Sequence, residues 1–196
     1  MTLLLAVLAM LAPALLVASA EPQTLPGESL YQLKLELTTQ DGTRIPLAQL
    51  RGHPVLISMF YASCAGVCPA IAFTMRRMEA ALTPEERSAL RPVLVSFDPE
   101  HDTNEALAEF AHLDKLEGPQ WIVAGTPQSR VRELAAALGV RYRALPGGAF
   151  SHSTIIAVLD ADGVIRGQTS NISELDPDFM RILAAAISAG TRKADH

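Results

Sequence analysis

The pattern of apolar and polar positions changes along the chain and predicts several short strands. Residues 30–37 (LYQLKLEL) alternate apolar and polar side chains, which indicates a half-buried strand. Residues 55–60 (VLISMF) are apolar at every position but Ser58 and are typical of a central strand that is covered on both faces. Shorter apolar runs predict further buried strands at 93–97 and 121–124.

Helical spacing predicts helices between these strands. Apolar residues over 71–82 recur every three or four positions on one face, so a helix is expected there. Residues 103–115 form a second expected helix. Thr126-Pro127 is typical of an N-cap followed by proline at the first helical position, which predicts a third helix that ends near Leu138.

In the last third of the chain, two predicted strands follow one another without a helix between them. Apolar strands are expected at 153–159 and 164–168, joined by the turn sequence DADG at 160–163. Asp176-Pro177 then begins a final amphipathic helix to about Ser188. Alternating strands and helices, followed by an antiparallel pair, predict an α/β fold. We expect a mixed central sheet with helices on both faces and a C-terminal β-hairpin plus helix.

The N-terminal segment differs from the rest in composition. Residues 1–20 carry no charged side chain and end in Ala18-Ser19-Ala20, the small-residue pattern of a signal-peptide cleavage site. We predict a signal peptide, or an N-terminal anchor if it is retained, followed by a linker at 21–29. One domain at 30–190 and a tail at 191–196 complete the expected organisation. The protein is therefore expected outside the cytoplasm, in the periplasm or on the outer face of the inner membrane.

Charge and cysteine content narrow the possible functions. The chain has 21 acidic and 16 basic side chains, for a formal net charge of -5, which argues against a nucleic-acid partner. Two cysteines are too few for a disulfide-stapled scaffold. In an exported protein they meet oxidants, so we interpret them as a pair.

This pair, Cys64 and Cys68, stands between the central strand at 55–60 and the helix expected over 71–82. The positive end of a helix favours a thiolate over a thiol and so lowers a cysteine pKa. Two thiolates are soft donors that select reduced copper, zinc or iron–sulfur clusters, but a specific site needs a third ligand. A simple disulfide that stiffens the start of the helix is the alternative.

The third ligand is sought among five histidines. His152 is the best candidate, because it stands at the start of the strand expected at 153–159, where an ordered segment can deliver an imidazole. His101, close to Asp98 after the strand at 93–97, remains an alternative. The other three are expected to be ordinary loop, helix or tail residues: His53, His112 and His196.

Three separated blocks together resemble the Sco/SenC proteins. They are CAGVCP at 64–69, VSFDPE at 95–100 followed by Asp102-Thr103, and His152-Ser153 before a strand. The resemblance covers residues 30–190 and implies a thioredoxin-like fold, with export or a membrane tether. It also implies delivery of copper to the binuclear copper centre of cytochrome c oxidase. The implied copper ligands are Cys64, Cys68 and His152.

The resemblance further implies partners and a form of control. The partners would be the copper-binding subunit of the oxidase, a thiol reductant and other copper carriers, with the membrane involved only through an N-terminal anchor. Oxidation of Cys64 and Cys68 to a disulfide would remove two of the three ligands. The chain departs from the family pattern at Ala65-Gly66 and at Ser151, where the family often has an acidic residue.

Other interpretations remain open at the level of sequence. Asp98 either lies near the copper site or caps the turn after its strand. The chain could instead be a thiol–disulfide oxidoreductase, in which Cys64 attacks and Cys68 resolves, so whether it is an enzyme stays undecided. Peroxide reduction and a metal-free redox-sensing or partner-binding role are further alternatives.

Overall fold

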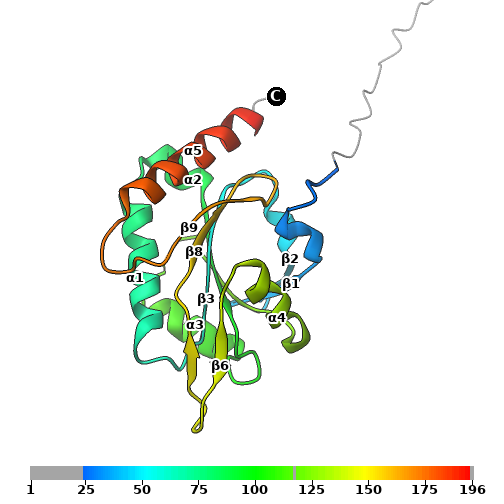
Figure 1. Ribbon diagram of the computed structural model, residues 1–196, viewed down its shortest axis with the longest axis vertical. Coiled ribbons are helices and arrows are strands. Elements are labelled where there is room, and N and C mark those ends of the chain that lie inside the picture. Colours follow the sequence, from blue (N-terminus) through cyan, green and yellow to red (C-terminus); the bar gives the residue numbers. More distant parts are fainter. Residues whose placement is uncertain (1–23, 117, 195–196) are drawn as a thin grey trace, which may run out of the picture.

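A seven-stranded sheet forms the centre of the protein in the computed structural model, which describes residues 24–116 and 118–194 (Figure 1). The expected signal peptide at 1–20 and His196 lie outside the described residues. Within the described ranges, no helix has both the length and the apolar character needed to cross a membrane.

The strand order in the sheet is β2-β1-β5-β4-β3-β8-β9. Strands β3, β4 and β5 are parallel, whereas β1, β2, β8 and β9 each run antiparallel to their neighbours. The strands of this sheet are β1 (Glu36–Thr39), β2 (Arg44–Pro46), β3 (Val55–Phe60), β4 (Arg91–Ser96), β5 (Ile122–Gly125), β8 (Ile156–Leu159) and β9 (Ile165–Thr169). A separate antiparallel pair consists of β6 (Tyr142–Ala144) and β7 (Phe150–His152).

Five α-helices and two 3-10 helices surround the sheet in the described part of the chain. They are α1 (Val67–Ala80), α2 (Pro84–Ala89), α3 (Asn104–Leu113), α4 (Gln128–Ala137), α5 (Pro177–Ala194), η1 (Leu30–Leu33) and η2 (Leu47–Leu50). Strand β3 lies between β4 and β8, and all six of its residues are buried. Both faces of this strand are covered, which is why its residues are apolar except for Ser58, whose hydroxyl donates a hydrogen bond of 2.6 Å to the carbonyl of Ile155.

Neighbouring residues of β9 show that helices cover both faces of the sheet. A Cβ at Gly167 would lie 3.0 Å from Ile182 of α5. The next side chain, Gln168, donates a hydrogen bond of 3.0 Å to the carbonyl of Leu138, at the end of α4. Successive strand residues point to opposite faces, so α4 and α5 lie on opposite sides of the sheet (Figure 1). The predicted α/β architecture with a mixed sheet is confirmed.

The strand expected at 30–37 is wrong in its first half. Residues Leu30–Leu33 form the 3-10 helix η1, and Lys34 follows with a φ of 50°, so β1 begins only at Glu36. Ser29 begins this turn, because its hydroxyl accepts a hydrogen bond from the N–H of Tyr31. Burial does not alternate along this turn, since the adjacent residues Leu30 and Tyr31 are both buried.

The strand expected at 153–159 is also corrected. It begins at Ile156 as β8, and His152 belongs instead to β7, in the separate hairpin with β6. The hairpin strands are three residues long, too short to give a periodic pattern in the sequence. For the same reason the short elements β2, η2 and α2 were not predicted.

Helix ends differ from expectation in α1, α4 and α5. Helix α1 begins at Val67 instead of Ile71 and ends at Ala80, so it includes Cys68, which was expected to precede it. Pro127, not Thr126, is the N-cap of α4, because the Thr126 hydroxyl donates to the carbonyl of Glu36 instead of capping the helix. Helix α5 continues beyond Ser188 to Ala194, into the segment expected to be a tail. Its predicted start is confirmed, since the carboxylate of Asp176 accepts hydrogen bonds from the N–H groups of the helix's first turn.

Candidate metal centre

The two cysteines lie where β3 leads into α1. Cys64 is in the connecting loop and is half-buried, and its N–H donates to the carbonyl of Tyr61 at 3.3 Å. Cys68 is the second residue of α1 and is completely buried. Pro69 follows in the first turn, where a missing N–H leaves no helix hydrogen bond unmade. The loop therefore holds one thiol at the surface and one in the interior.

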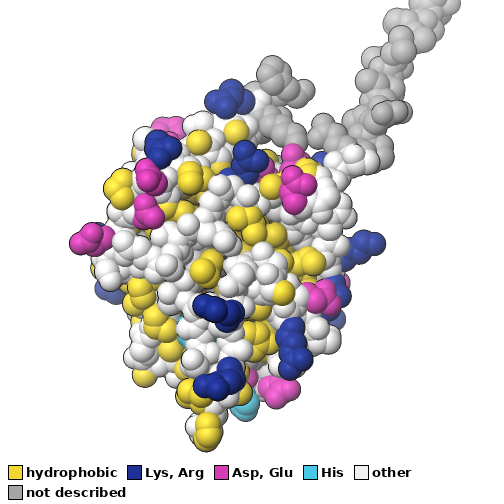
Figure 2. Space-filling model, in the orientation of Figure 1, with side chains coloured by type: hydrophobic (Ala, Val, Ile, Leu, Met, Phe, Trp, Pro, Cys, Tyr) yellow, Lys and Arg dark blue, Asp and Glu magenta, His cyan; other side chains and the backbone are white. Residues whose placement is uncertain are grey.

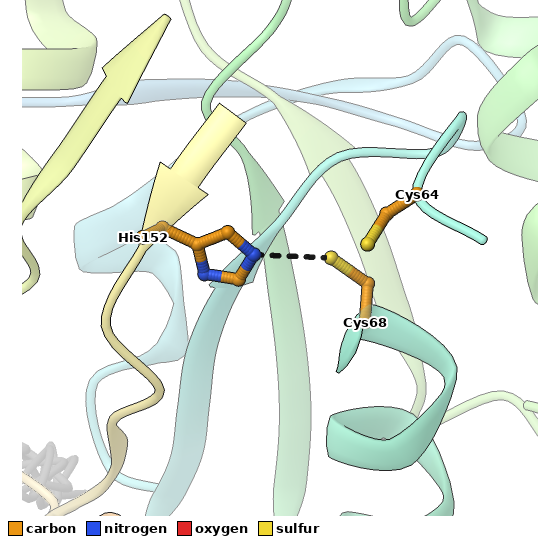
Figure 3. Close-up of side chains that lie close together, drawn as sticks. All are labelled: Cys64, Cys68 and His152. Carbon is orange, nitrogen blue, oxygen red and sulfur yellow. Dashed lines mark hydrogen bonds between the residues drawn. The ribbon is translucent and has the colours of Figure 1, made fainter. Parts of the chain in front are cut away.

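His152 reaches this pair from a distant part of the chain. Its Nε2 lies 3.7 Å from Sγ of Cys68, across 84 residues of sequence (Figure 3). The two sulfurs and an imidazole nitrogen all lie within 4.8 Å of one another. These three side chains are the one such group of potential metal ligands that the described residues bring together.

The imidazole of His152 is oriented by a backbone contact. Its Nδ1 lies 3.2 Å from the carbonyl oxygen of Ser153. A carbonyl only accepts hydrogen bonds, so in the neutral ring Nδ1 carries the proton and Nε2 presents its lone pair. That lone pair faces Sγ of Cys68.

Aromatic side chains surround the histidine. The His152 ring centroid lies 5.0 Å from that of Phe97 and 6.0 Å from that of Tyr61. Phe97 also stacks on Tyr142 and meets the edge of Phe150. The hairpin is thereby packed onto the ends of β3 and β4. This aromatic group was not assigned a role from sequence, because its members come from three separate segments.

The two thiols differ in acidity. Burial alone would raise the pKa of Cys64, but hydrogen bonds from the N–H groups of Cys68 and Gly66 and from neighbouring side chains outweigh it, so the pKa is lowered. Burial raises the pKa of the Cys68 thiol well above its ordinary value, and the nearby charges of Cys64 and Asp102 add to this. Cys64 is therefore the more readily ionised of the two.

The two aspartates after β4, Asp98 and Asp102, have different hydrogen-bond partners. The carboxylate of Asp98 lies 2.9 Å from Nδ1 of the exposed His101, and among the described residues it pairs with this imidazole. Asp102, to which the sequence pattern assigns no role, accepts hydrogen bonds from the Ala62 N–H and the Ser96 hydroxyl. The one sequence feature that pointed to Asp102 was its position in the family-like segment at 95–103. That segment also contains Asp98, and no pattern distinguished the two residues.

The remaining histidines lie elsewhere. His53 is at the opposite end of β3, with Nε2 3.4 Å from a guanidinium nitrogen of Arg91. Burial lowers the pKa of His53, and the charge of Arg91 adds to this. His112 is exposed on α3. Neither belongs to the group formed by Cys64, Cys68 and His152.

Comparison with known proteins adds a family match. The sequence model of the SCO1/SenC family matches residues 23–186. A Stutzerimonas stutzeri protein described as copper-binding is 27% identical over 149 residues, which cover 73% of this chain and 71% of that protein.

Solved structures are similar to this chain over most of its length. Bradyrhizobium japonicum ScoI with copper bound is 21% identical, with a TM-score of 0.62, and the match covers 78% of this chain and 96% of that one. BsSco, described as a Sco-family cytochrome c oxidase assembly protein with a disulfide switch, is 24% identical with a TM-score of 0.67, over 78% and 91% of the two chains. These similarities confirm the thioredoxin-like fold.

Proposed function

This chain belongs to the SCO1/SenC family, and we propose that it binds one copper ion through Cys64, Cys68 and His152 and delivers it to the binuclear copper centre of cytochrome c oxidase. The observation that carries the proposal is the approach of two sulfurs and one imidazole nitrogen to within 4.8 Å of one another. Relatives described as copper-binding, and one described as an oxidase assembly protein, support it.

The donor set suits copper as a cargo. Two thiolates and an imidazole form a soft, low-coordinate site, which reduced copper prefers. His152 needs no reorientation, because the Ser153 carbonyl already fixes its proton on Nδ1 and leaves Nε2 free to bind. Cys68 must give up its proton when the ion binds, so copper uptake releases protons.

Release of the cargo proceeds by ligand exchange. Cys64 is the more exposed sulfur, so a partner's thiol reaches the ion beside it. The partner's sulfur bonds to copper as the bond from copper to Cys64 breaks, and the proton lost by the partner's thiol passes to Cys64. Copper keeps its oxidation state in this step. The N-terminal segment, as a signal peptide or anchor, supports a location in the periplasm or on the outer face of the inner membrane.

The redox state of the cysteines controls binding in this proposal. The two sulfurs are both free and close together, and a disulfide between them would remove two of the three ligands. A thiol reductant is therefore a required partner in an oxidising compartment.

A second candidate function is thiol–disulfide exchange with client cysteines. The observation that favours it is the difference between the two thiols. Cys64 is half-buried with a lowered pKa, as an attacking thiol should be, and Cys68 is buried with a raised one, as a resolving thiol can be.

Anaerobic copper titration of the reduced protein tests the first function and separates the two. We expect the wild type to bind one copper ion per chain, and His152→Ala to lose at least about 100-fold in affinity, since even partners of a metal ligand contribute 10–100-fold. His112→Ala, which removes an exposed histidine of α3, should bind like the wild type. Absence of copper binding, together with rapid reduction of a test disulfide by wild type and His152→Ala alike, would favour the second function.

A further inference from the structure

A group of arginines lies beside the candidate metal centre. Arg141 and Arg143 line a hollow of about 390 Å³ together with His152. The same two arginines and Arg132 of α4 line an adjacent hollow of about 690 Å³. We call these three residues the arginine surface. No Asp or Glu is among the described residues that line either hollow.

The arginine surface is unusual for this chain. All three arginines are exposed, and the ion pairs found in the described ranges involve other arginines. The whole chain carries a formal net charge of -5, so this locally positive surface is opposite in sign to the protein as a whole. Figure 2 shows Lys and Arg side chains over the lower part of one face, where Figure 1 draws β6 and α4.

The register of the hairpin determines on which face Arg143 lies relative to His152. Tyr142 lies opposite His152, and Arg143 lies opposite Ser151. Alternation along the strands therefore points His152 toward the cysteines and Arg143 outward, one residue away from the ligand. Ser151 adds no negative charge there. Arg141 and Arg143 line the same hollow as His152, so a partner that enters this hollow meets both guanidinium groups, and charges attract one another most strongly within a Debye length of about 8–10 Å.

We propose that the arginine surface docks an acidic face of the protein that receives the copper ion. The occupant is a partner whose Asp and Glu side chains lie beside its own metal-accepting thiols. Guanidinium groups suit this role, because each can hold a carboxylate through two parallel hydrogen bonds. Attraction between the two faces speeds encounter and orients the partner's thiols toward the exposed side of the site. The inference rests on the proposed delivery of copper.

Copper transfer from the full, copper-loaded chain tests the docking surface. The acceptors are two synthetic peptides with the same pair of cysteines, one flanked by Asp and Glu and one by Lys. We expect Arg143→Glu to slow transfer to the acidic peptide by about tenfold at low ionic strength and to reduce the salt dependence of that rate. Transfer to the Lys peptide should not slow.

The matched control is Arg192→Glu. It changes the net charge by the same amount at an exposed position of α5, at the opposite end of the molecule from the hairpin (Figure 1). The docking proposal is overturned if Arg192→Glu slows transfer as much as Arg143→Glu does. It is equally overturned if Arg143→Glu slows transfer to an uncharged small chelator to the same extent, because the effect would then lie in the metal site.

A copper-free measurement separates failure of this inference from failure of the proposed function. Cysteine-free versions of the same peptides are titrated against the reduced chain and followed by fluorescence anisotropy. Preference for the acidic peptide that Arg143→Glu abolishes supports the docking surface even if the chain binds no copper. Normal copper binding without such a preference overturns the docking surface and leaves the proposed function standing.

Discussion

The carboxylate of Asp102 accepts a hydrogen bond of 3.0 Å from the backbone N–H of Ala62, 40 residues earlier in the chain. This bond links the loop after β4 to the loop after β3, which carries Cys64. The same carboxylate accepts a hydrogen bond from the hydroxyl of Ser96, and burial raises its pKa. Asp102 therefore anchors the loop that carries Cys64, without belonging to the group formed by Cys64, Cys68 and His152.

Asp102→Ala should weaken both the fold and the site. The Ala62 N–H and the Ser96 hydroxyl would lose their buried acceptor, which costs about 1–3 kcal/mol in the free energy of unfolding. A less fixed Cys64 loop should lower copper affinity by about tenfold, the scale of effects from groups that support a ligand. Urea unfolding and copper titration measure the two effects. Asp178→Ala, which removes an exposed ion pair with Arg181 on α5, should leave copper affinity unchanged and lower the free energy of unfolding by less than about 1 kcal/mol.

The two thiols should react at different pH values. Because the pKa of Cys64 is lowered and that of Cys68 is raised, only Cys64 forms a substantial fraction of thiolate below the ordinary thiol value of 9.0. Timed alkylation with iodoacetamide, read by peptide mass spectrometry, should label Cys64 first at every pH in this range. Equal labelling of the two residues would contradict the assigned difference. Cys64→Ser, which removes the fast site, should leave only slow labelling at Cys68.

The stability of the reduced, metal-free protein should fall at high pH because of Cys68. Its pKa in the folded state lies above the ordinary value of 9.0, so the folded state holds this proton more tightly than the unfolded chain does. The resulting stability is fully present below pH 9.0 and is lost as the pH rises above it. Unfolding in urea at a series of alkaline pH values should show a steeper decline for the wild type than for Cys68→Ala. Parallel declines would refute the assignment.

Oxidation should abolish copper binding, and a reductant should restore it. A disulfide between Cys64 and Cys68 takes both sulfurs from the ion, and closing so short a loop stabilises the fold by only about 2 kcal/mol. We expect the oxidised protein to show no copper binding in the titration and to unfold at a modestly higher urea concentration than the reduced one. His152→Ala should still form the disulfide, detected as a mass loss of two hydrogens. Copper binding that survives oxidation would contradict the redox control.

Long, strongly patterned segments were predictable because their own residues dictate them. The predominantly apolar run of β3, the apolar face of α1 and the capping of α5 by Asp176 are local properties, and the structure agrees with each. Strand β1 was predicted too early, because alternation alone does not separate a strand from the 3-10 turn η1 that precedes it.

The cysteine spacing and its place before a helix were likewise local, so the sequence by itself determined that Cys64 and Cys68 lie together at the start of α1. It did not determine what faces them. His152 meets Cys68 because a hairpin of two three-residue strands, each too short to leave a pattern, is packed against Phe97 and Tyr61 at the ends of two other strands. The direction of an imidazole, the support from Asp102 and the arginines beside the site depend on contacts between distant segments, and only the tertiary structure decides those.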